Sequence, residues 1–120
     1  MAVPNIGDRA PEINLPSILK KKFPLAEAVK RGPVVAAFFK ISCPVCQFTL
    51  PYLERIYKAY PGSKVAIVGV SQDEEDDTEE FAREYGITVP LLLDPVDHYP
   101  ASNAYDITNV PSIFLIADGR

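Results

Sequence analysis

A pair of cysteines three positions apart, Cys43 and Cys46, is the strongest constraint on what this chain can fold into. They are the only cysteines among its 120 residues. The apolar residues 34–39 before the pair predict a buried strand, and residues 44–60 after it predict a helix. The pair therefore lies where a strand ends and a helix begins, at the positive end of the helix dipole.

This position predicts a reactive thiol. We expect Cys43 to be the N-cap and Pro44 the first helical residue, where its missing N–H costs nothing. Free backbone N–H groups facing the Cys43 sulfur should lower its pKa below the ~8.5 of a free thiol, and the thiolate is the reactive form. A thiolate attacks a substrate disulfide, and a second thiol one helical turn away resolves the mixed disulfide. Such a dithiol needs no metal or organic cofactor.

A zinc half-site and a purely structural pair are the other interpretations of these cysteines. A structural zinc site needs four ligands, whereas the chain adds only His98 and no second cysteine pair. Buried structural cysteines are usually inert fillers. The strand, C-x-x-C and helix context favours a redox dithiol, and we expect no metal site.

The composition is that of one globular domain, residues 1–120, with 48% hydrophobic and 23% charged residues. A net charge of −4 argues against nucleic acid and anionic membranes as partners. No apolar run approaches the ~20 residues of a spanning helix. The opening residues lack the basic and apolar regions of a signal peptide, so we expect a cytoplasmic location.

Strands and helices are predicted to alternate along the chain, which favours an α/β domain with a central, mostly parallel sheet and flanking helices. We expect Pro51 to break and kink the helix that follows the cysteines. Asp77 is expected to cap the next helix, and Gly86 to end it. The predicted strands are residues 34–39, 65–70, 90–93 and 112–116, and the predicted helices are residues 25–31, 44–60, 77–85 and 100–105.

The order of strand, C-x-x-C, helix, strand, helix and then Asn109-Val110-Pro111-Ser112 resembles the thioredoxin superfamily. The opening residues 6–16 (IGDRAPEINLP), Pro51 and residues 89–94 (VPLLLD) are similar to the redoxin branch, which holds TlpA-like thiol-disulfide reductases and peroxiredoxins. The resemblance implies a thioredoxin-like fold and thiol-disulfide exchange. Its implied partners are a protein or small-molecule disulfide and a thiol electron donor.

The resemblance also implies a site around the cysteines. The family's proline before the late strand is cis and packs beside the dithiol, so this role falls to Pro111. We expect Cys43 to be the nucleophile and Cys46 the resolving thiol. Val110, Pro111 and Pro44 are expected to orient the substrate.

Three positions depart from the family pattern. Ser42 stands where thioredoxins have a tryptophan, Ala37 where they have a buried acid, and Thr49 where many TlpA-like proteins have a glutamate. The carboxylate that deprotonates the resolving thiol is therefore missing from both usual places. Lys40 is either an electrostatic partner of a thiolate or a solvated residue at the strand end, and the second is favoured.

Peroxide reduction is the alternative function. In peroxiredoxins the peroxidatic cysteine aligns with Cys46, and a threonine or serine three residues earlier orients the peroxide. That position is Cys43 here, and the family's arginine is missing from residues 110–112. A non-catalytic thioredoxin-like binding module is a third class, but such a module has no need to keep both thiols.

Several other features have plain structural interpretations. The acidic residues 73–80 predict a solvated loop and the first turn of a helix. His98 is predicted to be a loop residue without a functional role. Phe48 and Tyr52 could line a substrate groove, but helical spacing favours core positions.

The end of the chain carries a further expectation. In the thioredoxin fold the late strand, residues 112–117, precedes an antiparallel edge strand and a final helix, and both are absent from this sequence. We expect the late strand to be buried on both faces. Cover for it would then come from a further segment or from self-association.

Overall fold

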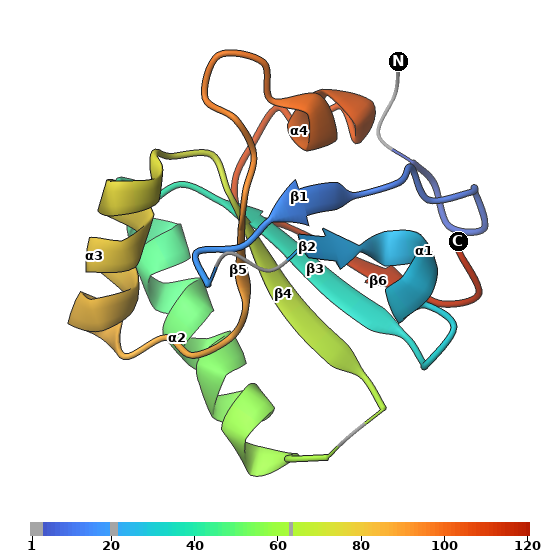
Figure 1. Ribbon diagram of the computed structural model, residues 1–120, viewed down its shortest axis with the longest axis horizontal. Helices are drawn as coiled ribbons and strands as arrows, with labels where there is room; N and C mark the ends of the chain where they lie inside the picture. Colours follow the sequence, from blue (N-terminus) through green and yellow to red (C-terminus); the bar gives the residue numbers. More distant parts are fainter. Residues whose placement is uncertain (1–3, 20–21, 63) are drawn as a thin grey trace.

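The computed structural model describes residues 4–19, 22–62 and 64–120 (Figure 1). Its central sheet is covered by α2 and α3 on one face, and by α1, α4 and the β1–β2 pair on the other. The elements along the chain are β1 (Asn14–Pro16), β2 (Lys22–Pro24), α1 (Leu25–Ala28), β3 (Val34–Phe39), α2 (Pro44–Ala59), β4 (Ala66–Ser71), α3 (Glu75–Tyr85), β5 (Leu91–Leu93), α4 (Pro100–Ala104) and β6 (Ser112–Ile116).

The central sheet has the strand order β5-β4-β3-β6. β3 is parallel to β4, and β4 is parallel to β5. β6 lies antiparallel to β3, with Ile116 opposite Val34 and Ser112 opposite Phe38. The predicted α/β fold is confirmed, with a sheet that is mixed because of β6.

Side chains of β3 alternate between two hydrophobic clusters. Val34, Ala36 and Phe38 belong to the cluster shared with α1, α4 and β1. Ala37 and Phe39 belong to the cluster shared with α2 and α3. Both faces of β3 are buried, which explains why its sequence is continuously apolar instead of alternating. β3 is also an inner strand of the sheet, and the cysteines follow its carboxyl end.

Two predicted helix details are wrong. α2 runs through Pro51 without the expected break, since the helix is continuous from Pro44 to Ala59. α3 begins at Glu75 with Glu74 as its N-cap, so Asp77 lies in the first turn instead of capping the helix. Acidic residues are favourable throughout a first turn, so they do not define a single starting residue. Gly86 ends α3 in the left-handed conformation, as predicted, with φ 66°.

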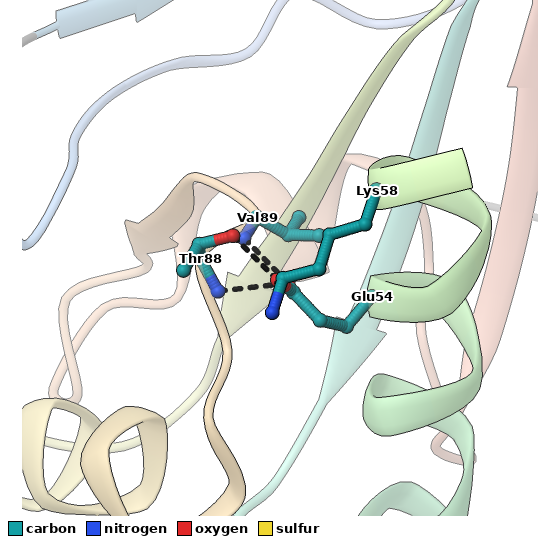
Figure 2. Close-up of polar contacts among 4 residues, drawn as sticks. All are labelled: Glu54, Lys58, Thr88 and Val89. Atoms are coloured by element: carbon teal, nitrogen blue, oxygen red, sulfur yellow. Dashed lines mark hydrogen bonds and ion pairs between the residues drawn. The ribbon is translucent and has the colours of Figure 1, made fainter. Parts of the chain in front are cut away.

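A buried carboxylate joins α2 to the segment before β5 (Figure 2). Glu54 is 5% exposed and accepts the backbone N–H groups of Thr88 and Val89 at 2.7 and 2.9 Å. The Thr88 hydroxyl donates to its other oxygen, and Lys58 Nζ lies 3.5 Å from the same oxygen. Burial would raise the Glu54 pKa, but these hydrogen bonds and the Lys58 charge lower it overall. The sequence analysis did not identify this interaction.

β6 is buried on one face only. Its residues Ile113 and Leu115 are 51% and 68% exposed, whereas Ile116 is buried. The expectation that this strand is buried on both faces is therefore wrong. The physical reason is its place at the sheet edge, where α2 covers the neighbouring strands but leaves these two side chains open.

Candidate active site

The two cysteines lie at the N-terminus of α2, directly after the turn that follows β3. Cys43 is the N-cap, with an extended backbone of φ −82° and ψ 118°, and Pro44 follows as the first helical residue. The Cys43 sulfur accepts the backbone N–H of Cys46 at 3.4 Å. The thiol thus takes the place that a serine or aspartate oxygen takes in other caps.

The helix N-terminus lowers the pKa of Cys43 below its ordinary value. The largest cause is the backbone N–H of Cys46, followed by the Cys46 side chain, and the N–H of Val45 also contributes. Desolvation opposes these effects. The side chain is half-buried, so the sulfur can be reached from solvent. Cys43 therefore combines thiolate character with access, the two requirements for a nucleophilic thiol.

Cys46 has the opposite environment. It is fully buried in the cluster between the sheet, α2 and α3. Burial is the main cause that raises its pKa to about 12, and the charges of Cys43 and Asp73 add to the effect. A backbone hydrogen bond with Lys40 acts in the opposite direction. Both cysteines are free in this structure.

The segment before β6 reaches the same site. The Val110–Pro111 peptide bond is cis, as the resemblance implied. The Val110 carbonyl oxygen lies 3.7 Å from the Cys43 sulfur, which donates to it in the thiol form. Residues 67 positions apart in the sequence therefore meet, with Pro44 next to Cys43 in the chain and Pro111 next to Val110.

The turn that carries the cysteines is held by two side chains that sequence reasoning missed. Asp73, in the loop between β4 and α3, accepts the backbone N–H of Ile41 at 2.8 Å. Gln47, in the first turns of α2, donates to the Ile41 carbonyl at 2.9 Å. The only signal in the sequence was that Asp73 follows a buried strand, at the sheet edge where Cys43 also lies.

Other candidates lie apart from the dithiol. The Lys40 side chain is exposed, and its contact with Cys46 is through the backbone. His98 is exposed in the loop before α4, where its carbonyl accepts the Asn103 amide. Phe48 and Tyr52 are 82% and 62% exposed, so the expectation that they are core residues is wrong. They lie on the solvent side of α2, because Leu50 and Leu53 form its buried side.

Among residues 4–19, 22–62 and 64–120, no three or more His, Cys, Asp or Glu side chains are grouped so that they could bind a metal ion. In the same part of the chain, no helix has the length and apolar character needed to span a membrane.

The mixed sheet, the flanking helices and the dithiol at the start of α2 define a thioredoxin-like domain of the redoxin branch. The sequence profile of the AhpC/TSA family matches residues 6–120, and the chain belongs to this family.

Relatives and solved structures agree with this assignment. The thiol-disulfide oxidoreductase ResA of Geobacillus thermodenitrificans (strain NG80-2) is 30% identical over 112 residues, which are 92% of this chain and 63% of that protein. This chain therefore spans less than two thirds of that relative. The thioredoxin domain of a thiol-disulfide oxidoreductase from Bacteroides vulgatus has a TM-score of 0.84 and 26% identity, over 95% of this chain and 83% of that one. The solution structure of a putative protein disulfide isomerase from Bacteroides thetaiotaomicron has the same TM-score and identity, over 100% and 79%.

Proposed function

We propose that this chain is a thiol-disulfide oxidoreductase that exchanges its Cys43–Cys46 dithiol with substrate disulfides. The observation that carries this proposal is the difference between the two thiols. Cys43 is accessible and has a lowered pKa, whereas Cys46 is buried and has a raised one. In such a pair, one thiol is the nucleophile and the other resolves the mixed disulfide. The similarity to ResA supports the same activity.

The reaction transfers two electrons in two exchanges. The Cys43 thiolate attacks one sulfur of a substrate disulfide, forms a mixed disulfide and releases the other sulfur as a thiolate, which takes up a proton. Cys46 then loses its proton, and its sulfur attacks the Cys43 sulfur. The Cys43–Cys46 disulfide forms, and the second substrate thiolate leaves. A thiol donor reduces the new disulfide by the reverse exchanges.

The residues around Cys43 are proposed to orient the substrate. Pro44 has no N–H, so the Cys43 sulfur accepts from N–H groups further along the helix. The Val110 carbonyl contacts the Cys43 sulfur and Pro111 follows it in the chain, so both are proposed to meet a substrate bound at Cys43. The proposed substrates are protein or small-molecule disulfides. A cytoplasmic location, expected from the sequence, remains part of this proposal.

The peroxidase alternative is not favoured. It assigns peroxide attack to Cys46, which is fully buried and has a pKa of about 12. A peroxidatic cysteine must be a thiolate that peroxide can reach. The accessible thiol here is Cys43, at the position where peroxiredoxins have a hydroxyl group.

Reduction of a protein disulfide by the reduced chain tests the proposal, with insulin as substrate and dithiothreitol as donor. We expect Cys43→Ser to abolish the reaction. Cys46→Ser should accumulate a mixed disulfide with the substrate, visible by mass spectrometry. Hydrogen peroxide turnover with the same donor is the comparison. Peroxide turnover that exceeds insulin reduction and needs only Cys46 would overturn the proposal.

A further inference from the structure

Asp73 connects the loop after β4 to the turn that carries the dithiol. Its Oδ2 atom accepts the N–H of Ile41, two residues before Cys43, at 2.8 Å. Gln47 Nε2 donates to the carbonyl of the same residue at 2.9 Å. The Ile41 backbone is therefore held on both its donor and its acceptor side. Any movement of Asp73 would be transmitted to the start of α2.

Asp73 is itself held in place by buried hydroxyl groups. Its backbone N–H donates to Ser71 Oγ at 3.1 Å, and Ser71 Oγ lies 2.7 Å from Thr78 Oγ1. Ser71 and Thr78 are fully buried, and the Thr78 hydroxyl also donates to the Glu74 carbonyl at 2.8 Å. This network ties the end of β4 to the first turn of α3. The carboxylate therefore has a defined position relative to the dithiol.

The Asp73 charge acts on the buried thiol. It raises the pKa of Cys46, after the larger effects of burial and of the Cys43 hydrogen bond and charge. Within the described residues, the charges that act on Cys46 are those of Cys43 and Asp73. Lys40 contacts Cys46 through its backbone, while its side chain is exposed.

We propose that Asp73 is a positioning residue of the exchange reaction: it anchors the dithiol turn through Ile41, and its negative charge opposes ionisation of the buried Cys46. This inference rests on the proposed function. It places a carboxylate at the dithiol turn, although Ala37 and Thr49 supply none. The consequence is that Cys43 attacks first, and that Cys46 resolves the mixed disulfide slowly at neutral pH.

The two exchanges can be timed separately with dithio-bis-nitrobenzoate, an aromatic disulfide. Attack by Cys43 releases one coloured nitrothiobenzoate, and attack by Cys46 on the mixed disulfide releases the second. One equivalent of the probe per reduced chain, followed by stopped flow between about pH 6 and pH 9, gives both rates. Asp73→Asn removes the charge but keeps an oxygen that can accept from Ile41. Asp73→Ala removes both the charge and the hydrogen bond to Ile41. Asp77→Asn is the control: it changes the net charge as Asp73→Asn does, but at an exposed neighbouring residue.

We expect Asp73→Asn to release the second nitrothiobenzoate severalfold faster than the wild-type chain at each pH. Without the Asp73 charge more of Cys46 is thiolate, and this gain outweighs the lower nucleophilicity of a less basic thiolate. The first release should be unchanged in Asp73→Asn and Asp77→Asn, and slower in Asp73→Ala.

Equal or slower second release in Asp73→Asn, with normal first release, would overturn the role of Asp73 and leave the proposed function intact. A wild-type chain that releases only one equivalent would instead contradict the proposed function, because Cys46 would not resolve the mixed disulfide. Unfolding curves of all variants, recorded under the same conditions, show whether a slower first release in Asp73→Ala comes from the turn or from global instability.

Discussion

Cys43 and Cys46 are chemically identical residues that the fold makes different. The first accepts a backbone N–H at the start of α2 and is open to solvent, and the second is enclosed by the sheet, α2 and α3. Their pKa values therefore shift in opposite directions. The two thiols are therefore suited to separate roles, one as nucleophile and one as resolving thiol.

The rate of alkylation by iodoacetamide as a function of pH tests the opposite pKa shifts of the two cysteines. In a Cys46→Ala variant, the rate at Cys43 should rise with a midpoint below the ~8.5 of a free thiol, because only the thiolate reacts. Mass spectrometry of the modified peptide identifies the site.

The matched control is Cys43→Ala, in which Cys46 is the sole thiol. We expect little modification of Cys46 up to about pH 9, since its pKa lies near 12 and its side chain is buried. Faster labelling of Cys46 than of Cys43 would contradict the assigned roles.

The position of α2 against its neighbours depends on Glu54. Glu54→Gln should lower the free energy of unfolding by about 1–3 kcal/mol, because it replaces a charged acceptor of two backbone N–H groups and a hydroxyl. Since the folded-state pKa of Glu54 is lowered, this contribution is complete above the ~4.3 of an unfolded glutamate and is lost as pH falls through the folded value. Urea unfolding at pH 7 and at about pH 3 measures the change.

Two variants serve as controls for Glu54→Gln. Glu84→Gln, on the exposed side of α3, should change stability by no more than ~0.5 kcal/mol. Lys58→Gln should be equally mild, because the Lys58 side chain is 63% exposed and such ion pairs contribute little. A loss in Lys58→Gln as large as in Glu54→Gln would show that the ion pair, and not the hydrogen bonds, holds the segment.

The packing of Leu91 of β5 and Phe39 of β3 against β4 depends on Gly69. A Cβ atom at this position would lie 2.7 Å from Leu91 Cδ2 and 3.0 Å from Phe39 Cε1. Both side chains are fully buried. Gly69→Ala should therefore cost about 1–3 kcal/mol through overpacking, measured by thermal or urea unfolding. A neutral or stabilising effect would mean that the packing between β4 and β5 can adjust.

At the scale of the whole molecule, the open face of β6 is the feature with the largest consequence. Ile113 and Leu115 expose apolar surface at the edge of the sheet, at a cost of ~25 cal/mol per Å². Self-association of the 120-residue chain remains a prediction. Sedimentation velocity at micromolar concentration should show a species heavier than the 13.2 kDa monomer.

The double variant Ile113→Ser and Leu115→Ser is the control for self-association. Both side chains are already more than half exposed, so we expect it to fold and to sediment as a monomer. A wild-type chain that is a compact monomer and unfolds cooperatively would show that the exposed face of β6 does not drive association.

Most of the elements could be predicted because each has a strong local signal. The apolar run of β3 and the proline after Cys43 define the start of the site. The first residue of a helix is harder to predict within an acidic run: Asp77 was the expected cap, but it lies in the first turn of α3. The exposure of Phe48 could not be predicted, because helical spacing shows which residues share a face but not which face is covered.

The sequence by itself determined the fold class, the place of the dithiol between strand and helix, and the cap position of Cys43, because these depend on neighbouring residues. Only the tertiary structure decided which groups meet the dithiol from elsewhere in the chain. Val110 reaches Cys43 because β6 pairs with β3. Asp73 reaches Ile41 because β4 lies beside β3 and ends at the same edge of the sheet. Strand pairing depends on contacts between distant segments, and no local pattern encodes those contacts.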